Sequence, residues 1–517
     1  FCVLLIFIDP DFMSIKVVNL ECDFRFYQTS KWIADKISKS IYISLTTSLS
    51  YHMTSQIVAI ILTFQFFISS TFAQKNVDPN LIYSESELKA DLKYLKNKLE
   101  NKHPGLYLYT SKSNLDQLFD SLENGISKPM TEMEFYKHLA ILCSMIKDGH
   151  TILLPSSTNT NFHYSMSHFL PYHFVILKHQ LFIDMVYTND ESIPIGSEII
   201  RINHIEANEI IKKLSTRLVR DGNNLTYPNW ILNNYFRQYY SFIYGHPDNY
   251  DIDYKTNGQV FTATIKALPI DSIFYYRQKH YPNKTFSTLP NDGLKLNFIN
   301  ENNYAILTIK DFHNDVLKKD YKQNFKSVIA SFLEQIKKSQ TENLVLDLRN
   351  NQGGDIENGV YLLSYLLDKP FSIVQKYYRV EKNKLKQCKG PSLGQHNPKS
   401  NPFKGKLYVL INGGSFSNSG IVASCLQSNH RATFIGQETG GNPNVITGFT
   451  KDITLPNTKI QVQIPTKQFV ITDKLNNDGH GVIPDHNVEP ILRDILENKD
   501  TVLDYCIELI NKTKKDK

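Results

Sequence analysis

Apolar residues recur every three or four positions in the segment that follows the first eighty residues, and this spacing predicts amphipathic helices. Two of these helices begin at capping boxes, Ser84–Glu87 and Thr131–Glu134, and a further helix is expected at about 113–122. The last of them ends at Asp148-Gly149-His150-Thr151. Residues 78–152 are therefore expected to form a small helical domain that places His150 at a helix end.

The hydrophobic pattern changes to short strands between residues 162 and 275. A helix is expected at 207–218, and the stretch 227–244 is dense in aromatic residues. That stretch is typical of a buried helix plus a loop, and it is also compatible with an apolar wall over a substrate cleft. The strands expected in this region are His173–Leu177, Gln180–Val186 and Gln259–Ile265.

Strands alternate with helices between residues 295 and 495, and this alternation predicts a core built from β-α crossovers. A closing helix is expected at 501–511, within a C-terminal segment of residues 496–517. The whole pattern indicates an α/β protein with added α+β elements, and the length of 517 residues requires several domains. The expected strands of the core are 304–309, 344–348, 407–412, 432–436, 451–455 and 460–464, and its expected helices are 321–338, 357–367 and 419–428.

One strand-turn-helix pattern carries candidate chemistry. The apolar run Leu407–Ile411 is broken by Gly413 and Gly414, and serines follow at positions 415, 417 and 419. Serines at such a place commonly cap the helix. A serine held above a sheet edge beside backbone N–H groups can also act as a nucleophile.

The N-terminal region is expected to contain a targeting signal. An uncharged apolar run covers Ile57–Ala73, with small residues at its end, so residues 53–73 are expected to be a signal peptide cleaved after Ala73. The alternative is an uncleaved anchor, for which the run is at the short limit. Residues 1–52 precede the first plausible start, Met53, and are expected to be an upstream extension that is not part of the working protein.

Composition and charge remove several other classes of function. Lys plus Arg is 57 and Asp plus Glu is 51, so the net charge of +6 is too mild for a nucleic-acid footprint. The six cysteines form no pattern with zinc-ligand spacing, so no metal is expected. After signal removal no stable membrane span is expected, and the oligomeric state is left open.

Acyl transfer requires a nucleophile, a base, a group that orients the base, and donors for an oxyanion. The sequence offers Ser417, His150 and Asp478 for the first three roles. Gly354 and Asn418 could each supply an oxyanion N–H. These residues lie far apart in the sequence, so their spacing alone does not assemble them.

Several separated segments resemble the superfamily of tail-specific (C-terminal processing) serine peptidases, which includes the tricorn protease core and a retinoid-binding protein. They are Asp148–Thr151, Leu344–Gly354, Val409–Ala423 with Arg431–Gly440, and Gly481–Asp485. The resemblance implies a ClpP/crotonase-like protease core at 295–495 and a PDZ-like region at 162–275. It also implies that no cofactor is needed.

The resemblance assigns the nucleophile to Ser417 and the oxyanion N–H groups to Gly354 and Asn418. Processing peptidases of the family use a lysine base where this chain has Asn442, so the tricorn-like branch with serine, histidine and an acidic residue is implied. In that branch His150 is the base and Asp478 the acidic member. Glu438 and His480 are held in reserve, and the choice between Asp478 and Glu438 stays open.

The sequence therefore predicts a secreted or periplasmic serine-type peptidase that acts on a peptide or protein substrate. One alternative is a non-catalytic ligand- or peptide-binding protein on the same scaffold. Another is an esterase with 227–244 as its cleft wall. The region around Ile195–Asn203 resembles the back half of a PDZ module, but no clear carboxylate-binding loop precedes it.

Overall fold

The computed structural model describes residues 78–515, apart from 283–291, 300–303 and 473–478. The expected extension 1–52 and signal peptide 53–73 lie outside the described residues. The described residues from Asn80 onward belong to one compact unit. None of the helices in the described ranges is long and apolar enough to cross a membrane. The domain boundaries expected from the sequence remain predictions.

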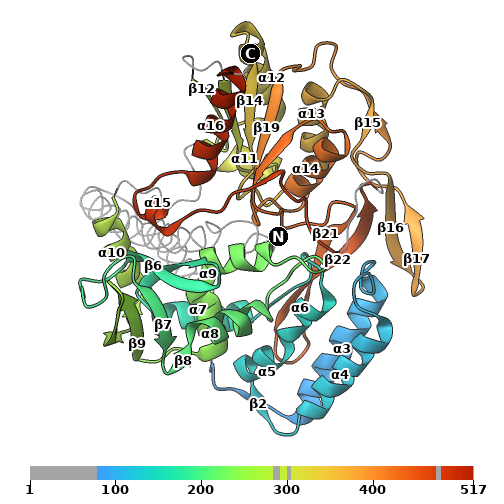
Figure 1. Ribbon diagram of the computed structural model, residues 1–517. Helices are drawn as coiled ribbons and strands as arrows, with labels where there is room; N and C mark the ends of the chain where they lie inside the picture. The colour runs from blue at the N-terminus through green and yellow to red at the C-terminus, as the bar shows by residue number, and fades with distance from the viewer. Residues whose placement is uncertain (1–77, 283–291, 300–303, 473–478, 516–517) are drawn as a thin grey trace, which may run out of the picture. The chain divides into compact units, whose positions relative to one another are not determined.

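The N-terminal helices, labelled α3 to α6 in Figure 1, begin and end close to where the sequence predicts them. Both capping boxes are present. The side chains of Ser84 and Thr131 each accept from the backbone N–H three residues on, and the glutamate side chain at that position accepts from the backbone N–H of Ser84 or Thr131. The last predicted helix is interrupted at Ala140 and forms two helices. The four are α3 (Glu85–Lys102), α4 (Lys112–Gly125), α5 (Glu132–Leu139) and α6 (Ile141–Ile146).

A mostly parallel sheet forms the centre of the core, with the strand order β12-β13-β14-β19-β20-β23. Only β12 runs antiparallel to its neighbour. The strands are β12 (Leu294–Ile299), β13 (Tyr304–Ile309), β14 (Asn343–Asp347), β19 (Lys406–Ile411), β20 (Thr433–Gly436) and β23 (His486–Asn487). Asp347 pairs with Leu410, so β14 and β19 end side by side, and the turns that follow them meet at one edge of the sheet.

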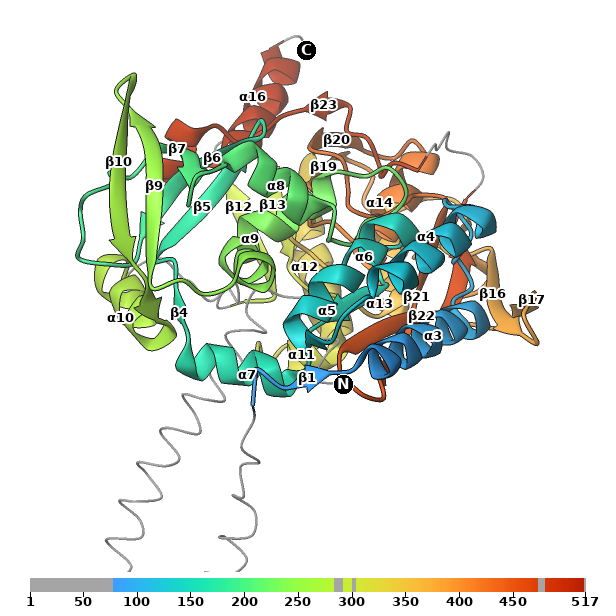
Figure 2. The same ribbon diagram turned by 90° about the horizontal axis from the view of Figure 1, so that it is seen from below.

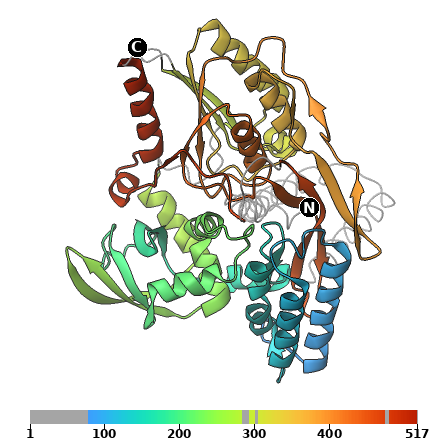
Figure 3. The ribbon, with the colours of Figure 1, turned by 45° about the vertical axis from the view of Figure 1, so that its right-hand side comes forward.

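Helices cover both faces of this sheet. α16 packs its Val502, Cys506 and Ile510 on Tyr304 and Val345 and on their neighbours in the sheet. The helices α12, α13 and α14 lie on the opposite face (Figures 1 and 3). The helices of the core are α11 (Asn314–Lys319), α12 (Phe325–Lys338), α13 (Ile356–Leu366), α14 (Asn418–Ser428), α15 (Leu492–Leu496) and α16 (Thr501–Lys515).

A second sheet of the core, ordered β17-β16-β22-β21, contacts the N-terminal helical region. β21 (Val445–Thr454) and β22 (Gln461–Val470) are each longer than the sequence predicts, and the hairpin of β16 (Lys376–Glu381) and β17 (Lys384–Cys388) is not predicted at all. β3 (Ile152–Leu154) pairs with β22. This pairing fixes the chain two residues after His150 to the core, and α3 lies beside the same sheet (Figure 2).

The middle region is an antiparallel sheet, ordered β10-β9-β7-β6-β5, with helices beside it. Its strands are β5 (Tyr172–Leu177), β6 (Gln180–Val186), β7 (Glu198–Ile202), β8 (Ile205–Glu206), β9 (Asn249–Thr256) and β10 (Gln259–Lys266). Its helices are α7 (Ser157–Met166), α8 (Ala207–Ser215), α9 (Thr226–Tyr244) and α10 (Ile270–His280). The remaining strands form two-residue pairs, β1 (Ile82–Tyr83) with β2 (Met130–Thr131), β4 (His168–Phe169) with β11 (Leu268–Pro269), and β15 (Phe371–Ser372) with β18 (Gln395–His396).

The aromatic stretch 227–244 lies in the buried helix α9, which consists of two helical parts joined by a kink at Tyr235. Its side chains cover the outer edge of β5. Arg237 donates to the carbonyls of Leu170 and Tyr172, at 2.8 and 3.0 Å, and Asn233 accepts from the Ile176 N–H at 2.6 Å. The outer edge of β5 is therefore occupied by this helix.

Candidate active site

The turn between β19 and α14 presents Ser417 at the start of the helix. Ser417 has φ 51° and ψ −124°, a left-handed conformation that non-glycine residues rarely adopt and that is common at functional turns. Its neighbours are engaged with the backbone, because the Ser415 hydroxyl donates to Leu348 O at 2.9 Å and the Ser419 hydroxyl reaches the same oxygen at 3.5 Å. Of the three serines, Ser417 is the half-buried one, while Ser415 and Ser419 are fully buried.

His150 lies against this serine, although 267 residues separate the two in the sequence. The distance between His150 Nε2 and Ser417 Oγ is 3.3 Å. Lys147 ends α6 in a left-handed conformation, and the chain then turns His150 toward the serine before it enters β3. The Phe416 ring packs on the imidazole, with 4.6 Å between ring centroids, and it stacks on Tyr227 at 4.3 Å on its other side.

The imidazole is set up to accept a proton. Burial lowers the pKa of His150 to about 4, although the carboxylate of Asp148 opposes the shift. The ring is therefore neutral near pH 7. Its Nδ1 is buried and has no hydrogen-bond partner among the described residues. A neutral imidazole that carries its proton on Nδ1 presents a lone pair on Nε2, toward Ser417.

The acidic member expected from the sequence, Asp478, lies outside the described residues. Gly479, the next residue, accepts from the Asn223 N–H at 2.7 Å. The two reserve candidates bond each other, with His480 Nδ1 and Glu438 Oε1 3.2 Å apart. Glu438 Oε1 also accepts from the Gly481 N–H at 2.6 Å. Within the described part of the chain, no hydrogen bond joins either reserve residue to His150.

The two proposed oxyanion donors come from adjacent turns. Gly353 and Gly354 follow β14 with φ of 99° and 130°, which favour glycine. A Cβ on Gly353 would lie 2.7 Å from both the Asn418 nitrogen and the Ser417 Cβ. The turn thus touches Ser417 directly, and any side chain at this position would displace Ser417. Neither the Gly354 N–H nor the Asn418 N–H has a hydrogen-bond partner in the described ranges.

The position where the lysine-dependent branch has its base is occupied by a turn-forming residue. The side-chain oxygen of Asn442 accepts from the backbone N–H groups of Asn444 and Val445, at 2.8 and 3.1 Å. Its amide nitrogen contacts the hydroxyl of Tyr109. Asn442 is therefore used to shape its own turn, and it offers no proton acceptor comparable with a neutral lysine.

Sequence reasoning missed the buried carboxylate of Asp221. It accepts from the Gly149 N–H at 2.7 Å and from the Asn442 N–H at 3.1 Å. Burial and the neighbouring Asp148 raise the pKa of the Asp221 carboxyl to about 7, and the two N–H donors oppose the rise. The only local signal is an Asp-Gly pair, which by itself indicates a turn.

The chain also contains Trp230 directly behind the nucleophile turn. Its indole N–H donates to the Asn350 side-chain oxygen at 2.8 Å, and its ring stacks on Tyr227 with centroids 6.1 Å apart. A Cβ on Gly414 would come within 2.4 Å of the indole nitrogen. Trp230, Tyr227, Phe416 and His150 therefore form one continuous run of ring contacts.

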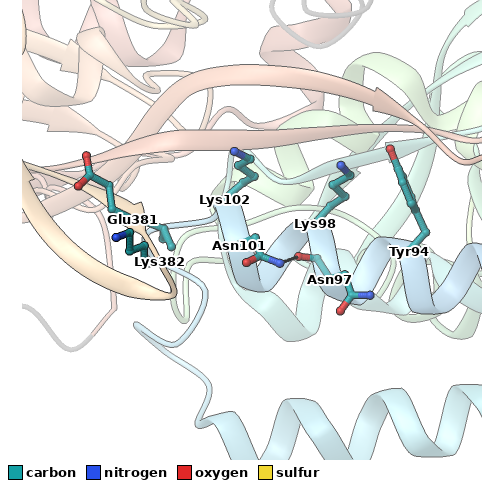
Figure 4. A pocket seen from close by; sticks show the side chains of 8 residues that line it. Tyr94, Asn97, Lys98, Asn101, Lys102, Glu381 and Lys382 are labelled. Atoms are coloured by element: carbon teal, nitrogen blue, oxygen red, sulfur yellow. Dashed lines mark hydrogen bonds between the residues drawn. The ribbon is translucent and has the colours of Figure 1, made fainter.

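Two pockets lie near the surface of the described residues. One of about 500 Å³ is next to the catalytic turns, and its lining includes Trp230, Asn233, Asn350 and Asn412. The other, of about 650 Å³, lies between α3 and the β16–β17 hairpin (Figure 4). Lysines line the second pocket, and none of the residues assigned a catalytic role here lies in its wall.

Comparison with known proteins shows which family the core resembles. Residues 303–488 match the family model described as peptidase family S41. A carboxyl-terminal-processing protease from Picosynechococcus sp. is 32% identical over 121 residues, 23% of this chain and 27% of that one. Carboxyl-terminal-processing peptidase 2, chloroplastic, from Arabidopsis thaliana is 27% identical over 168 residues, 32% of this chain and 30% of that one. The chain thus covers well under half the length of these curated relatives.

The fold is also shared with a solved structure over most of the chain. The structure of mature CPAF complexed with lactacystin has a TM-score of 0.61 and 16% sequence identity. The match covers 83% of this chain and 98% of that one. A second structure of mature CPAF gives a TM-score of 0.60 at 15% identity. The structural likeness establishes the α/β fold, and the sequence match establishes that the chain contains a peptidase family S41 domain, at residues 303–488.

Proposed function

We propose that this protein is a serine-type peptidase that hydrolyses peptide bonds through an acyl-enzyme on Ser417, with His150 as the general base. The observation that carries the proposal is the 3.3 Å approach of His150 Nε2 to Ser417 Oγ inside a family S41 domain. Apo geometries of this kind are often slightly long and shorten when substrate binds. A peptide or protein is the substrate class proposed.

Each residue has the role that acyl transfer by a serine nucleophile requires. Neutral His150 takes the proton of Ser417 as its oxygen attacks the carbonyl carbon, and the carbonyl oxygen becomes an oxyanion. The N–H groups of Gly354 and Asn418 stabilise that oxyanion, each contributing about 3 kcal/mol. His150 then protonates the leaving amine. Water, activated by the same imidazole, hydrolyses the ester and releases Ser417.

We assign the acidic role to Asp478. The buried Nδ1 of His150 needs an acceptor, and none is present in the described ranges. Gly479 bonds Asn223, whose own side chain accepts from Lys147 Nζ at 2.9 Å, so the chain next to Asp478 lies close to the His150 loop. Glu438 is the alternative, but its Oε1 already accepts from the Gly481 N–H and Asn224 Nδ2.

We also propose that the protein is exported. The support is the uncharged apolar run that ends at Ala73, followed by the polar run that starts at Gln74. N-terminal sequencing of material from the culture medium or periplasm tests this. A mature N-terminus at Gln74 supports the proposal, and a mature start upstream of Met53 contradicts it.

Labelling with a fluorophosphonate probe tests the catalytic proposal. Wild type is expected to be labelled, and Ser417→Ala is expected to lose all labelling because its nucleophile is gone. His150→Ala is expected to be labelled at least about 10²-fold more slowly, since general-base catalysis contributes about that much. Ser428→Ala, at the far end of α14, is the matched control and should be labelled like wild type.

Two results would contradict the proposal. Equal labelling of Ser417→Ala and wild type would remove Ser417 as the nucleophile. Absence of labelling in folded wild type would favour a non-catalytic binding protein on the same scaffold.

A further inference from the structure

The six residues 221–226, which we name the clasp, lie between α8 and α9 and include the first residue of α9. They form hydrogen bonds with three separate loops. Gly222 N–H donates to Lys147 O at 3.0 Å, in the loop that carries His150. Asn223 N–H donates to Gly479 O at 2.7 Å. Asn224 Nδ2 donates to Thr439 O at 2.9 Å, in the loop that precedes Asn442. The clasp therefore connects chain segments that the parallel sheet does not hold together.

Asp221 supplies the carboxyl group of the clasp, and its two oxygens have different partners. Oδ1 accepts from the Gly149 N–H at 2.7 Å, and Oδ2 accepts from the Asn442 N–H at 3.1 Å. The side chain is almost fully buried, at 3% exposure. Burying a carboxyl group beside Asp148 is unfavourable, and the hydrogen bonds that Asp221 accepts offset only part of this free-energy cost. A buried carboxyl group that lowers the stability of the fold is therefore more readily explained by a role in positioning the groups that it binds.

The two N–H groups that Asp221 bridges flank the reacting atoms. Gly149 directly precedes His150. A Cβ on Gly149 would lie 2.6 Å from the Phe416 ring and 3.0 Å from Asp221 Oδ1, so a side chain at this position would not fit without a shift of its neighbours. On the other side, Asn442 directly follows Gly441, whose added Cβ would lie 3.6 Å from the Ser417 nitrogen. One carboxylate thus links the backbone beside the base to the backbone beside the nucleophile.

A second carboxylate holds the next N–H group of the same loop. Asp148 accepts from the His150 N–H at 2.9 Å, from the Thr151 hydroxyl at 3.0 Å and from the Thr447 hydroxyl at 2.6 Å. Thr447 belongs to β21, so Asp148 anchors the loop to the second sheet. Asp148 and Asp221 therefore fix consecutive peptide groups, those of Gly149 and His150, to two different parts of the core.

We propose that Asp221 is a positioning residue that holds His150 at Ser417 by bridging the backbone N–H groups of Gly149 and Asn442. The inference rests on the proposed function, because it assigns Asp221 a role in the rate of acylation of Ser417. Asp221 acts through the backbone and not by contact with substrate. A displacement of the base by about 1 Å is enough to lower a catalytic rate by about 10²-fold.

The test is Asp221→Asn compared with Asp91→Asn. Asparagine keeps the size of the side chain, but its amide group cannot accept from one of the two N–H donors. Asp91 is a matched control on α3, since it is equally buried and accepts from the Asn457 and Thr458 N–H groups at 2.9 and 2.8 Å. It plays no part in the clasp or the catalytic turns.

The fluorophosphonate reaction is measured at a range of probe concentrations for each folded variant. Asp221→Asn is expected to lower the maximal labelling rate by about 10- to 10²-fold with little change in the half-saturating concentration. Asp91→Asn is expected to keep the wild-type labelling rate, even if its melting temperature falls as much as that of Asp221→Asn. A loss of rate in both variants, in proportion to their loss of stability, would overturn the proposal.

Hydrogen–deuterium exchange supplies a readout that does not depend on activity. In Asp221→Asn, the peptides that contain the Gly149 and Asn442 amides are expected to exchange faster, while those over 457–458 stay protected. The reverse is expected for Asp91→Asn. Unchanged exchange at Gly149 and Asn442 would overturn the proposal. If Asp221→Asn exchanges faster at these amides but the wild type is never labelled by the probe, the bridging role of Asp221 would stand. The proposed peptidase function would then be wrong.

Discussion

The imidazole of His150 combines two properties that a general base needs. It is close to the hydroxyl it would deprotonate, and burial keeps its pKa well below its ordinary value. An imidazole whose pKa lies that low is uncharged at neutral pH, with one ring N–H and one nitrogen lone pair that can accept a proton. The hydrogen-bond capacity of Nδ1 determines which tautomer forms, so the group that meets Nδ1 controls whether Nε2 can accept.

The lowered pKa of His150 leads to a prediction about pH. Protonated His150 cannot accept the Ser417 proton, so the rate falls as pH falls through the pKa of this residue. Burial lowers that pKa to about 4, so the labelling rate is expected to stay high at about pH 5 and to be lost toward about pH 4. The measurement is the fluorophosphonate labelling rate against pH, with circular dichroism to confirm that the protein stays folded. An acid limb centred near the ordinary histidine pKa of about 6.5 would contradict it.

Individual site residues differ in how far the sequence reveals them. Ser417 follows an apolar strand and a glycine pair, and His150 follows a helix that ends at glycine, so both stand out locally. Asp221 does not, because its partners lie 72 and 221 residues away and its local context is an ordinary turn. A role that consists only of tertiary hydrogen bonds leaves no periodicity or motif to read.

Between elements, one arginine joins the end of β14 to the start of α16. Arg349 is bidentate to Asp347, at 2.9 and 2.8 Å, and to Asp500, at 2.7 Å for both bonds. Burial raises the pKa of the Asp347 carboxyl, but Arg349 outweighs this, and the pKa ends below its ordinary value. Bidentate pairs of this kind add fixed geometry to the charge interaction. Asp500 also caps α16 by accepting from the Leu503 N–H.

Removal of this arginine is expected to be costly. Arg349→Ala leaves the buried carboxylate of Asp347 without its cation, which destabilises a protein by about 3–5 kcal/mol. Asp500→Ala is the milder variant, because the Asp500 side chain is 40% exposed and Arg349 keeps Asp347 as a partner. Urea denaturation measures both. A loss of under about 1 kcal/mol for Arg349→Ala would show that solvent replaces the arginine.

Elements with strong end signals are predicted best. The two capping boxes fix the starts of α3 and α5. The start of α12 is predicted too early, because Asn324 accepts from the Ser327 N–H and so begins the helix at Phe325. The β16–β17 hairpin is missed because its second strand, Lys384–Cys388, is almost fully exposed and carries no alternating apolar face.

Across the whole described chain, the candidate active site is assembled from parts that are distant in sequence. β3 brings the segment with His150 onto β22, and Asp91 on α3 binds the loop at 457–458. The α/β class and the crossover core are predicted from the sequence and confirmed by the fold. The sequence could not show these pairings, since register between distant strands is set by packing and not by any local pattern.

The C-terminal helix is expected to be essential for the core. Truncation after Asp500 removes Val502, Cys506 and Ile510 from the sheet face they cover. Each buried side chain of this size contributes about 1.5–3 kcal/mol, so most of the stability of a typical domain is lost. Truncation after Asn511 retains all three and is expected to change the free energy of unfolding by under about 1 kcal/mol. Equal solubility and equal denaturant midpoints for the two truncations would contradict this.

The position of Trp230 has a spectroscopic consequence. The sequence contains two tryptophans, Trp32 and Trp230, and Trp230 is the one that lies in the described residues. In a Trp32→Phe variant of this sequence the indole of Trp230, bonded to Asn350 and in close contact with Gly414, would be the single tryptophan fluorophore. Its fluorescence would come from one place in the molecule, immediately behind the turn that presents Ser417. Emission from this variant would thus act as a built-in optical reporter of the nucleophile's support, without any introduced label.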